Sequence, residues 1–303
     1  MLTNLEKYLG KGRVRQNVQL APVTTFKVGG PAEFYFEAQS DNDLIQAVKV
    51  SHDLHIPMHV FGGISNVIIG SDGLKGLVIK NLIAYKKTIE EKEDYCLLRV
   101  SGGYNMTRLA KETAEFGYEG LEYHLGLPGT VGGGLCVNSG WYAHPPSKYI
   151  GDPVHEVCLI SKDGATRIEP KEYFHFDYDY SVLKKTGEIV LWVDFKLKKA
   201  DPEELFQHGR EALDYRKKTQ PFGIPSSGCY FQNIDGKSAG RIIDQAGLKG
   251  YTIGGAQVST IHANFIVNTG HATSEDVQKL AQHVKETVKT KFGIHLEEEI
   301  IWL

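Results

Sequence analysis

A run of glycines in the middle of the chain limits what its backbone can do there. Residues 126–140 read GLPGTVGGGLCVNSG, with glycine at positions 126, 129, 132, 133, 134 and 140. Glycine loses much backbone entropy on folding, so such a cluster predicts left-handed conformations or close approach of main chain to another group. The run contains no lysine or arginine. A phosphate bound here would be held by backbone N–H groups, and the run therefore points to a nucleotide cofactor.

Two familiar phosphate-binding patterns are excluded in this run. A dinucleotide-binding fingerprint needs GxGxxG, but after Gly132 and Gly134 the next required glycine is Val137. A Walker A loop needs GxxxxGK followed by Ser or Thr. The spacing that starts at Gly129 fits, but Leu135 stands where the lysine is required. Neither standard loop is present.

A second glycine loop precedes this run in the chain. Residues 59–66 read HVFGGISN and overlap a predicted strand over 58–61. Two loops that donate backbone N–H groups can hold the two phosphates of a dinucleotide without a cationic side chain, because pre-oriented N–H groups bind anions well. Tight turns alone would also explain these glycines. From the residues by themselves, both interpretations stay open.

Composition narrows the class of protein. The 303 residues allow about two or three domains, and the net charge of −3, with both signs interspersed, gives no electrostatic case for nucleic acid or an anionic membrane. The four cysteines show no CxxC pairing, which favours a reducing compartment. No apolar run approaches the roughly 20 residues of a membrane span, and the N-terminus lacks the apolar core of a signal peptide. We expect a soluble, cytoplasmic monomer without a metal site.

Hydrophobic periodicity and turn residues predict an α+β fold, because helices and strands mix without strict βαβ alternation. A change in the residue pattern near 198–202 predicts a linker. Ser274 is the expected N-cap of the last helix. Helices are predicted over 40–55, 105–116, 203–218, 239–246 and 274–292. Strands are predicted over 58–61, 77–81, 96–100, 156–160, 166–170, 188–197, 229–232, 264–268 and 296–303.

Several motifs together resemble those of one bacterial enzyme family. Residues 24–32 read TTFKVGGPA, similar to the TTFxIGGPA opening of the shorter type of bacterial UDP-N-acetylenolpyruvoylglucosamine reductases. GGISN resembles the GGGSN loop of that family, and the run at 126–140 resembles its GIPGTVGGAxxMNAG loop. Further matches lie at 220–233, 238–250 (SAGRIIDQAGLKG), 257–268 (QVSTIHANFIVN) and 296–300. The matches follow the order of the family from about residue 17 to the C-terminus.

The resemblance implies an FAD-binding fold of the vanillyl-alcohol-oxidase (PCMH) type and a C-terminal α+β substrate-binding domain. On this basis we predict FAD-binding subdomains over 1–82 and 83–199 and a substrate-binding domain over 200–303. FAD is the implied cofactor and NADPH the implied hydride donor. The implied cofactor-binding residues are Gly62, Gly63, Ile64, Ser65, Asn66, Gly126, Pro128, Gly129, Gly132, Gly133, Asn138 and Gly140.

The resemblance also implies a nucleotide-sugar substrate, the enolpyruvyl ether of UDP-N-acetylglucosamine. Its reduction to UDP-N-acetylmuramate is a step of peptidoglycan precursor synthesis, and needs a hydride at one alkene carbon and a proton at the other. The alternative is an oxidase or dehydrogenase of the same flavin fold that acts on another sugar or alcohol. The implied substrate-binding residues are Tyr178, Asn233, Lys249, His262 and Asn264.

The implied proton donor is Cys229. It stands where the family has a serine in a GSxF motif, and a thiol with a pKa near 8.5 is mostly protonated at neutral pH. Glu299 matches the glutamate of the last strand of the family. Glu297 is the fallback, because residues two apart on a strand share a face. Ile301 replaces the basic residue that often follows in the family.

One position departs further from the family pattern. The YRxS motif of the family reads YDYS here at 178–181, so that Asp179 stands where an arginine would stabilise an enolate. An anion at that position disfavours the build-up of negative charge on the substrate. We predict that Asp179 is one of the catalytic residues, and we expect another cation to compensate for its negative charge. Lys184, Arg216 and Arg241 are the candidates.

Overall fold

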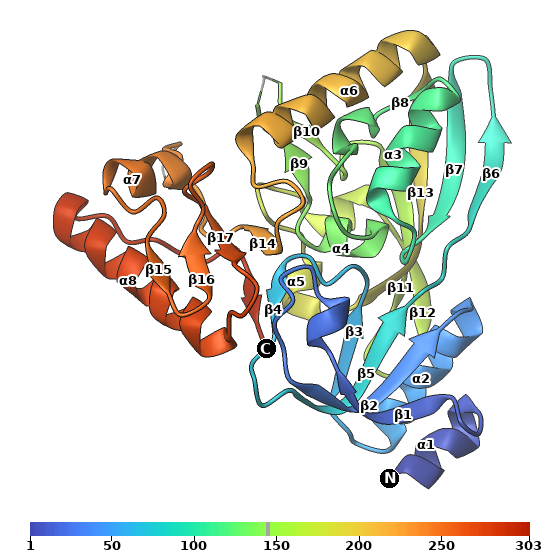
Figure 1. Cartoon of the computed structure of the whole chain (residues 1–303). Coiled ribbons are helices and arrows are strands. Elements are labelled where there is room, and N and C mark those ends of the chain that lie inside the picture. Colours follow the sequence, from blue (N-terminus) through green and yellow to red (C-terminus); the bar gives the residue numbers. More distant parts are fainter. Residues whose placement is uncertain (144–145, 235) are drawn as a thin grey trace. The chain divides into compact units, whose positions relative to one another are not determined.

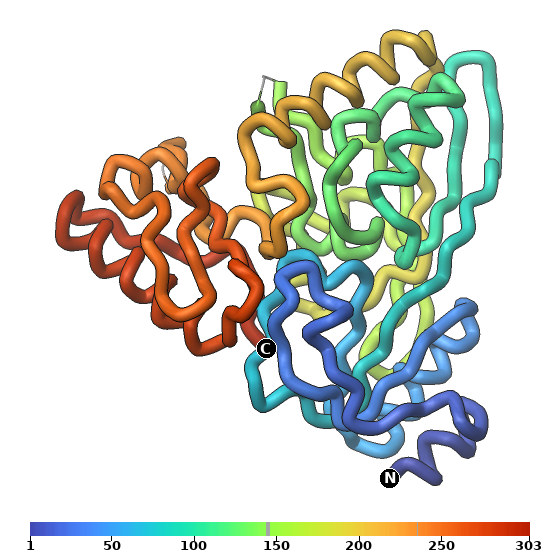
Figure 2. Tube along the Cα trace, in the orientation of Figure 1, coloured from blue at the N-terminus to red at the C-terminus, as the bar shows by residue number. Residues whose placement is uncertain are grey.

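The computed structural model describes residues 1–143, 146–234 and 236–303. The chain divides into two compact units (Figure 1). The N-terminal unit comprises Met1–Gln16, Phe34–Gly63 and Lys75–Asp214. The C-terminal unit comprises Asn17–Glu33, Ile64–Leu74 and Tyr215–Leu303. Two segments from the first quarter of the chain, which the colour bar of Figure 2 locates, therefore belong to the same unit as the C-terminus. The three-part division at 82/83 and 199/200 stays a prediction.

The first sheet of the N-terminal unit has the strand order β1-β2-β5-β3. Strand β3 pairs in parallel with β5, in a register that places Phe61 beside Lys80. Leu44, Ala47 and Val48 form the buried stripe of helix α2, as the helical period of the sequence requires, and pack with the apolar side chains of the sheet. The elements are α1 (Leu2–Leu9), β1 (Val14–Gln19), β2 (Pro31–Ala38), α2 (Asp41–Asp53), β3 (Met58–Phe61) and β5 (Leu74–Asn81).

The second sheet has the order β12-β11-β13-β7-β6, and β8 also pairs with β13. Strand β13 is buried along most of its length because apolar clusters cover both faces: Val193 and Phe195 lie in one core, Leu191 and Trp192 in another. Helix α3 contributes Leu109 to the core that contains Val193 and Phe195, and α4 contributes Val131 and Leu135. The elements are β6 (Lys86–Glu91), β7 (Tyr95–Ser101), α3 (Met106–Glu115), β8 (Tyr118–Glu119), α4 (Val131–Cys136), β11 (Val154–Ile160), β12 (Thr166–Pro170) and β13 (Ile189–Lys199).

Short elements fill the connections of this unit. Strand β9 (Gly140–Trp141) pairs with β10 (Lys148–Tyr149), directly after the glycine-rich run. Helix α6 leads from β13 towards the C-terminal unit and includes the residues at which the two units divide. The remaining elements are η2 (Glu122–His124), η3 (Lys171–Phe174), α5 (Leu183–Thr186) and α6 (Pro202–Thr219).

The C-terminal unit is a four-stranded sheet, β14-β17-β16-β15, packed with two helices. The buried stripe of α8, which includes Val277, Leu280 and Val284, forms one core with apolar residues of the sheet. At the end of the chain, β18 pairs in parallel with β4. The elements are η1 (Ala21–Val23), β4 (Val67–Ile68), β14 (Ser226–Cys229), α7 (Ala239–Gln245), β15 (Thr252–Ile253), β16 (Ala256–Val258), β17 (Phe265–Asn268), α8 (Ser274–Phe292) and β18 (Ile301–Trp302).

The structure corrects three local predictions. The N-cap of α8 is Thr273 rather than Ser274, because its side chain accepts the Asp276 N–H and the Asp276 carboxylate accepts in return. The strand predicted over 229–232 ends at Cys229 in β14. The predicted strand over 296–303 is regular only in β18, since the segment before it makes a single bridge, from Glu298 to Phe231. Within the described residues, no helix combines the length and the apolar character that crossing a membrane requires.

Candidate functional site

The two glycine loops predicted from the sequence lie against each other in the N-terminal unit. A Cβ atom placed on Gly62 would lie 1.9 Å from Oγ1 of Thr130, and one placed on Gly63 would lie 2.5 Å from Cα of Gly129. Both distances are shorter than real Cβ contacts. At Gly63 the neighbour is main chain, so only glycine allows that approach. Two segments far apart in the sequence thus form one backbone surface.

Backbone hydrogen bonds fix the second loop where α4 begins. The N–H of Val131 donates to the carbonyl of Tyr104 at 2.9 Å, and that of Gly132 donates to the carbonyl of Gly102 at 2.8 Å. The carbonyl of Gly129 accepts from the N–H of Met106 at 3.1 Å. These bonds anchor the loop to the turn between β7 and α3.

Little of the protein outside the loop itself approaches Gly133. Apart from its chain neighbours and the backbone of its own helix, the only described atom within 4 Å of a Cβ placed on Gly133 is Oγ1 of Thr130, at 3.6 Å. The N–H of Gly63 donates no hydrogen bond to any described residue. An open glycine face with an unpaired N–H suits the diphosphate of a dinucleotide. The predicted residues 64–66 belong to the C-terminal unit.

Asn138 and Gly140 serve the internal structure of the second loop. Asn138 is buried in a left-handed conformation, with φ of 44°. Its Nδ2 donates to the carbonyl of Asp177 at 2.9 Å, and its Oδ1 accepts from the N–H of Gly151 at 3.1 Å. A Cβ placed on Gly140 would lie 2.8 Å from Oη of Tyr142. The Asn138 side chain therefore joins the loop to the segment that contains Asp179.

Asp179 forms an ion pair with Lys184. The Asp179 carboxylate lies 2.9 Å from Nζ of Lys184, and its residue is only 6% exposed. Asp179 also has a left-handed φ of 47°. Close by, Oγ of Ser181 donates to the carbonyl of Cys136, at the end of α4, at 2.8 Å. Lys184 thus neutralises Asp179, which stands at the position of the family arginine. Asp179 in turn holds a cation at this turn.

Of the other candidate cations, Arg216 is buried in the C-terminal unit, where loss of water contact lowers the pKa of its guanidinium to about 10. Arg241 is exposed on α7. Tyr178 precedes Asp179 and makes an edge-on ring contact with Tyr142, with centroids 5.5 Å apart.

In the C-terminal unit, Cys229 ends β14 and pairs with Phe265 of β17. Burial of the thiol, followed by the nearby Glu299 carboxylate, raises the pKa of Cys229 to about 12, and a hydrogen bond with Asn264 acts in the opposite direction. The thiol is therefore protonated across the physiological range. Cys229, Glu299 and Asn264, which the sequence predicts as site residues, therefore lie together.

The main chain of the last residues positions Glu299 beside Cys229. The N–H of Glu299 donates to the carbonyl of Tyr230 at 2.8 Å, one residue beyond the cysteine. Asn66 contacts the same residue, because its Nδ2 donates to the carbonyl of Glu299 at 3.3 Å. Glu297, the fallback, is exposed.

Asn264 and His262 are ordered by a chain of hydrogen bonds. The side chain of Asn264 accepts from the N–H of Phe231 at 2.9 Å and donates to the carbonyl of Phe231 at 2.7 Å. The N–H of Asn264 donates to Nδ1 of His262 at 3.2 Å. Burial, together with nearby Lys249, lowers the pKa of His262, so the ring is neutral. Because Nδ1 accepts, the proton of the neutral ring is on Nε2.

Two predicted substrate ligands also have partners inside the C-terminal unit. Oδ1 of Asn233 accepts from the N–H of Ala239 at 3.0 Å, in the first turn of α7. Nζ of Lys249 lies 2.8 Å from the carboxylate of Asp244, and both side chains keep considerable exposure. Contact of either residue with substrate stays a prediction.

Comparison with known proteins places the chain in a family. Residues 220–303 match the family model described as UDP-N-acetylenolpyruvoylglucosamine reductase, C-terminal domain, and residues 32–168 match a model described as FAD binding domain. The chain is 35% identical to the UDP-N-acetylenolpyruvoylglucosamine reductase of Anoxybacillus flavithermus over 95% of this chain and 94% of that protein. The enzyme of Protochlamydia amoebophila is 37% identical, over 94% and 92% of the two chains.

The chain belongs to the UDP-N-acetylenolpyruvoylglucosamine reductase family. The crystal structure of the enzyme from Thermus caldophilus superposes with a TM-score of 0.80 at 32% identity, and covers 96% of this chain and 98% of that one. The predicted α+β fold and the predicted family are therefore confirmed. As a member of this reductase family with an FAD-binding domain, the protein is an FAD-dependent oxidoreductase.

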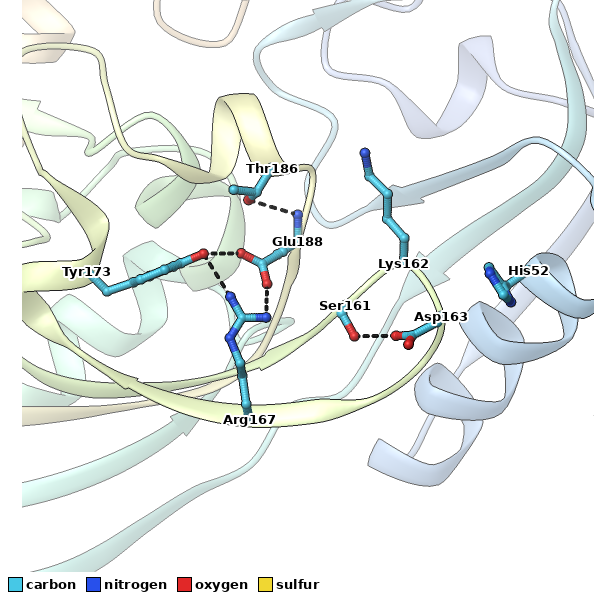
Figure 3. Close-up of a pocket in the computed structure, with 8 residues that line it drawn as sticks. All are labelled: His52, Ser161, Lys162, Asp163, Arg167, Tyr173, Thr186 and Glu188. Atoms are coloured by element: carbon cyan, nitrogen blue, oxygen red, sulfur yellow. Dashed lines mark hydrogen bonds and ion pairs between the residues drawn. The ribbon is translucent and has the colours of Figure 1, made fainter.

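A surface depression in the N-terminal unit is lined by residues that belong to neither glycine loop (Figure 3). Its polar groups bind one another: Oη of Tyr173 donates to the carboxylate of Glu188 at 2.6 Å, and Arg167 contacts both. It contains none of the predicted cofactor or substrate residues. In the described part of the chain, no three His, Cys, Asp or Glu side chains are grouped so as to bind a metal ion.

Sequence reasoning missed two residues that shape the first glycine loop. Thr130 lies under Gly62, and Lys80 donates a hydrogen bond from Nζ to the carbonyl of Gly62. The available signal for Lys80 is its charge within LVIKN, an otherwise apolar strand. Thr130 carries no comparable signal, because its contact depends on a segment almost 70 residues earlier.

Proposed function

We propose that this protein reduces the enolpyruvyl ether of UDP-N-acetylglucosamine to UDP-N-acetylmuramate, with NADPH as electron donor. The reaction adds a hydride to the methylene carbon of the alkene and a proton to the carbon that carries the ether oxygen. FAD, once bound and reduced by NADPH, would supply the hydride. The two electrons of the hydride reduce the carbon–carbon double bond. The observation that carries the proposal is the protonated Cys229 thiol, grouped with Glu299 and Asn264 in the C-terminal unit.

Cys229 is the proposed proton donor. A pKa of about 12 means that the thiol retains its proton at neutral pH, so it is ready to donate in every turnover. A carbanion next to a carboxylate is a far stronger base than a thiolate, so the transfer is favourable despite the raised pKa of the thiol. The thiolate left behind regains its proton from solvent.

Glu299 is proposed to assist the recovery of the thiol after this proton transfer. Its carboxylate disfavours a persistent thiolate at Cys229, which speeds the return of the thiol to its protonated form. The hydrogen bond from Glu299 N–H to the carbonyl of Tyr230, the residue after Cys229, keeps Glu299 next to Cys229. The role of Glu299 is thus electrostatic and does not require it to change protonation state.

Lys184 is the proposed cation in place of the family arginine. Asp179 holds the Lys184 ammonium at 2.9 Å, at the turn where that arginine would stand. A positive charge there can stabilise the enolate that forms when hydride reaches the methylene carbon. Asp179 then acts as a positioning residue, and Lys184 contacts the substrate carboxylate.

The flavin is proposed to lie along Gly62, Gly63 and the loop at 126–140, where the open backbone surface fits a diphosphate. Lys249 and the Nε2–H of His262 are proposed to face the nucleotide sugar, together with Asn233. We further propose that the enzyme acts as a monomer and takes its substrate in the cytoplasm, without a nucleic acid partner.

Stopped-flow measurement of the two half-reactions tests the proposal. We expect NADPH to reduce the bound flavin and the UDP-enolpyruvyl sugar to reoxidise it. In Cys229→Ala, reduction is unchanged and reoxidation slows about 100-fold or more. Cys158→Ala, which removes another thiol, is the matched control and leaves both steps unchanged. Failure of the sugar to reoxidise the flavin would favour another alcohol or sugar, and equal slowing of both steps would remove Cys229 as proton donor.

A further inference from the structure

Lys80 of β5 reaches across to the first glycine loop. Its backbone lies beside Phe61 of β3 in the parallel pair, and its Nζ donates a hydrogen bond to the carbonyl oxygen of Gly62, the residue that follows β3. The residue is partly buried, and this loss of water contact lowers the pKa of the ammonium group, although Glu37 acts in the opposite direction. A cation held in such a place needs a partner, and the Gly62 carbonyl is that partner.

The contact determines which way one peptide group faces. The carbonyl of Gly62 and the N–H of Gly63 belong to the same planar trans peptide, so they point in opposite directions. With the carbonyl turned towards Lys80, the Gly63 N–H points away from β5. That N–H is the one that donates to no described residue.

Two consecutive glycines would otherwise leave this peptide free to rotate, because glycine adopts positive and negative φ with similar ease. The Cα of Gly63 packs on Gly129, and Gly62 packs on Thr130, so the loop is fixed in place by its neighbours. These packing contacts restrict the position of the loop but not the direction of its polar groups. The bond from Lys80 supplies that direction.

We propose that Lys80 is a positioning residue for the cofactor, which turns the Gly62–Gly63 peptide so that the Gly63 N–H meets a phosphate oxygen of the FAD diphosphate. Lys80 acts through the peptide and does not contact the cofactor itself. The inference rests on the proposed binding of FAD at the glycine loops. Lys80 lies outside both glycine loops, so the glycine patterns themselves do not include it.

Titration of the apoprotein with FAD, followed by flavin fluorescence, measures the effect. Lys80→Met removes the donor and keeps the length of the side chain, so we expect the Kd for FAD to rise about tenfold. Lys75→Met is the matched control, because Lys75 lies on the same strand and is exposed, and we expect an unchanged Kd. Lys80→Gln keeps a neutral donor and gives an intermediate Kd; it also serves if Lys80→Met does not fold.

The 31P resonances of FAD at saturation separate orientation of the peptide from general stability. In the Lys80 variants these resonances move towards those of free FAD, whereas in Lys75→Met they match the wild type. An unchanged Kd in the Lys80 variants, or weaker binding with wild-type 31P shifts, overturns the inference. Failure of the wild-type protein to bind FAD would instead overturn the proposed function.

Discussion

The side chain of Asn66 donates a hydrogen bond to the main-chain carbonyl of Glu299 at 3.3 Å, across 233 positions of sequence. The carbonyl of Asn66 also accepts from the N–H of Ile301 at 3.0 Å. A residue of the first glycine loop motif thereby supports the segment that carries the proposed catalytic glutamate. Both residues belong to the C-terminal unit.

Replacement of Asn66 by alanine removes this side-chain bond and leaves the backbone bond in place. We expect Asn66→Ala to lower the free energy of unfolding by about 1 kcal/mol, the usual net value of one hydrogen bond. Urea denaturation of the apoprotein measures the loss. No change in the denaturation midpoint would show that solvent replaces the Asn66 amide without cost.

Two glycine substitutions distinguish packing from cofactor contact. Gly63→Ala places a methyl group 2.5 Å from Cα of Gly129, so we expect the apoprotein to lose thermal stability and FAD affinity together. Gly133→Ala meets only Thr130 Oγ1 at 3.6 Å, so we expect the apoprotein to keep its melting temperature while FAD binds more weakly. Differential scanning calorimetry and FAD titration test both. Unchanged FAD affinity in Gly133→Ala would place the cofactor elsewhere.

The raised pKa of Cys229 predicts slow alkylation. Only the thiolate reacts with iodoacetamide, so at pH 8.5 a pKa of about 12 makes Cys229 roughly a thousandfold slower than an ordinary exposed thiol. Glu299→Gln removes the neighbouring negative charge and should speed the reaction. Peptide mapping by mass spectrometry follows Cys229 separately from the other cysteines. Rapid alkylation of the wild-type residue would contradict a protonated donor.

Substitutions in the Asp179–Lys184 pair should affect stability and activity differently. Lys184→Met leaves a buried carboxylate without its ammonium partner, which we expect to cost about 2 kcal/mol of unfolding free energy. The double variant Asp179→Asn with Lys184→Met removes both charges and should regain most of that stability. Reoxidation by the sugar should remain slow in both variants. Normal reoxidation in the double variant would exclude Lys184 as the enolate-stabilising cation.

Glu112 of α3 predicts a pH dependence of stability. Burial acts to raise its pKa, but hydrogen bonds from Lys86, Tyr104 and Arg108 outweigh this and lower the pKa to about 2, from an ordinary value near 4.5. A depressed carboxyl pKa stabilises the folded state above the unfolded value, and this stability is lost as the pH falls from 4.5 towards 2.

The matching variant is Glu112→Gln. At pH 7 we expect it to be less stable than wild type by about 2 kcal/mol, with allowance for solvent screening, and the difference should shrink below pH 4.5. Chemical denaturation over this pH range measures both proteins. A difference that does not depend on pH would assign the effect of Glu112 to packing.

Local patterns explain why much of the fold could be predicted. Strand β3 has the predicted bounds, and the strands predicted over 156–160 and 166–170 pair with each other, with Ile160 opposite Thr166. The end of the chain was predicted less well, because only two of the eight residues predicted as a strand pair with β4. The N-cap of α8 also shifted by one residue, since Thr273 and Asp276 form the reciprocal bonds that Ser274 cannot form.

The sequence by itself determined the family, the α+β class and the two glycine loops, because each is written in contiguous residues with fixed spacing. Only the tertiary structure decided what the loop residues contact: Gly63 lies against Gly129, and Lys80 donates to the carbonyl of Gly62. The partners come from separate strands, loops and turns, so no local period records them. Their meeting depends on how the sheets bring distant backbone together, which a linear pattern does not specify.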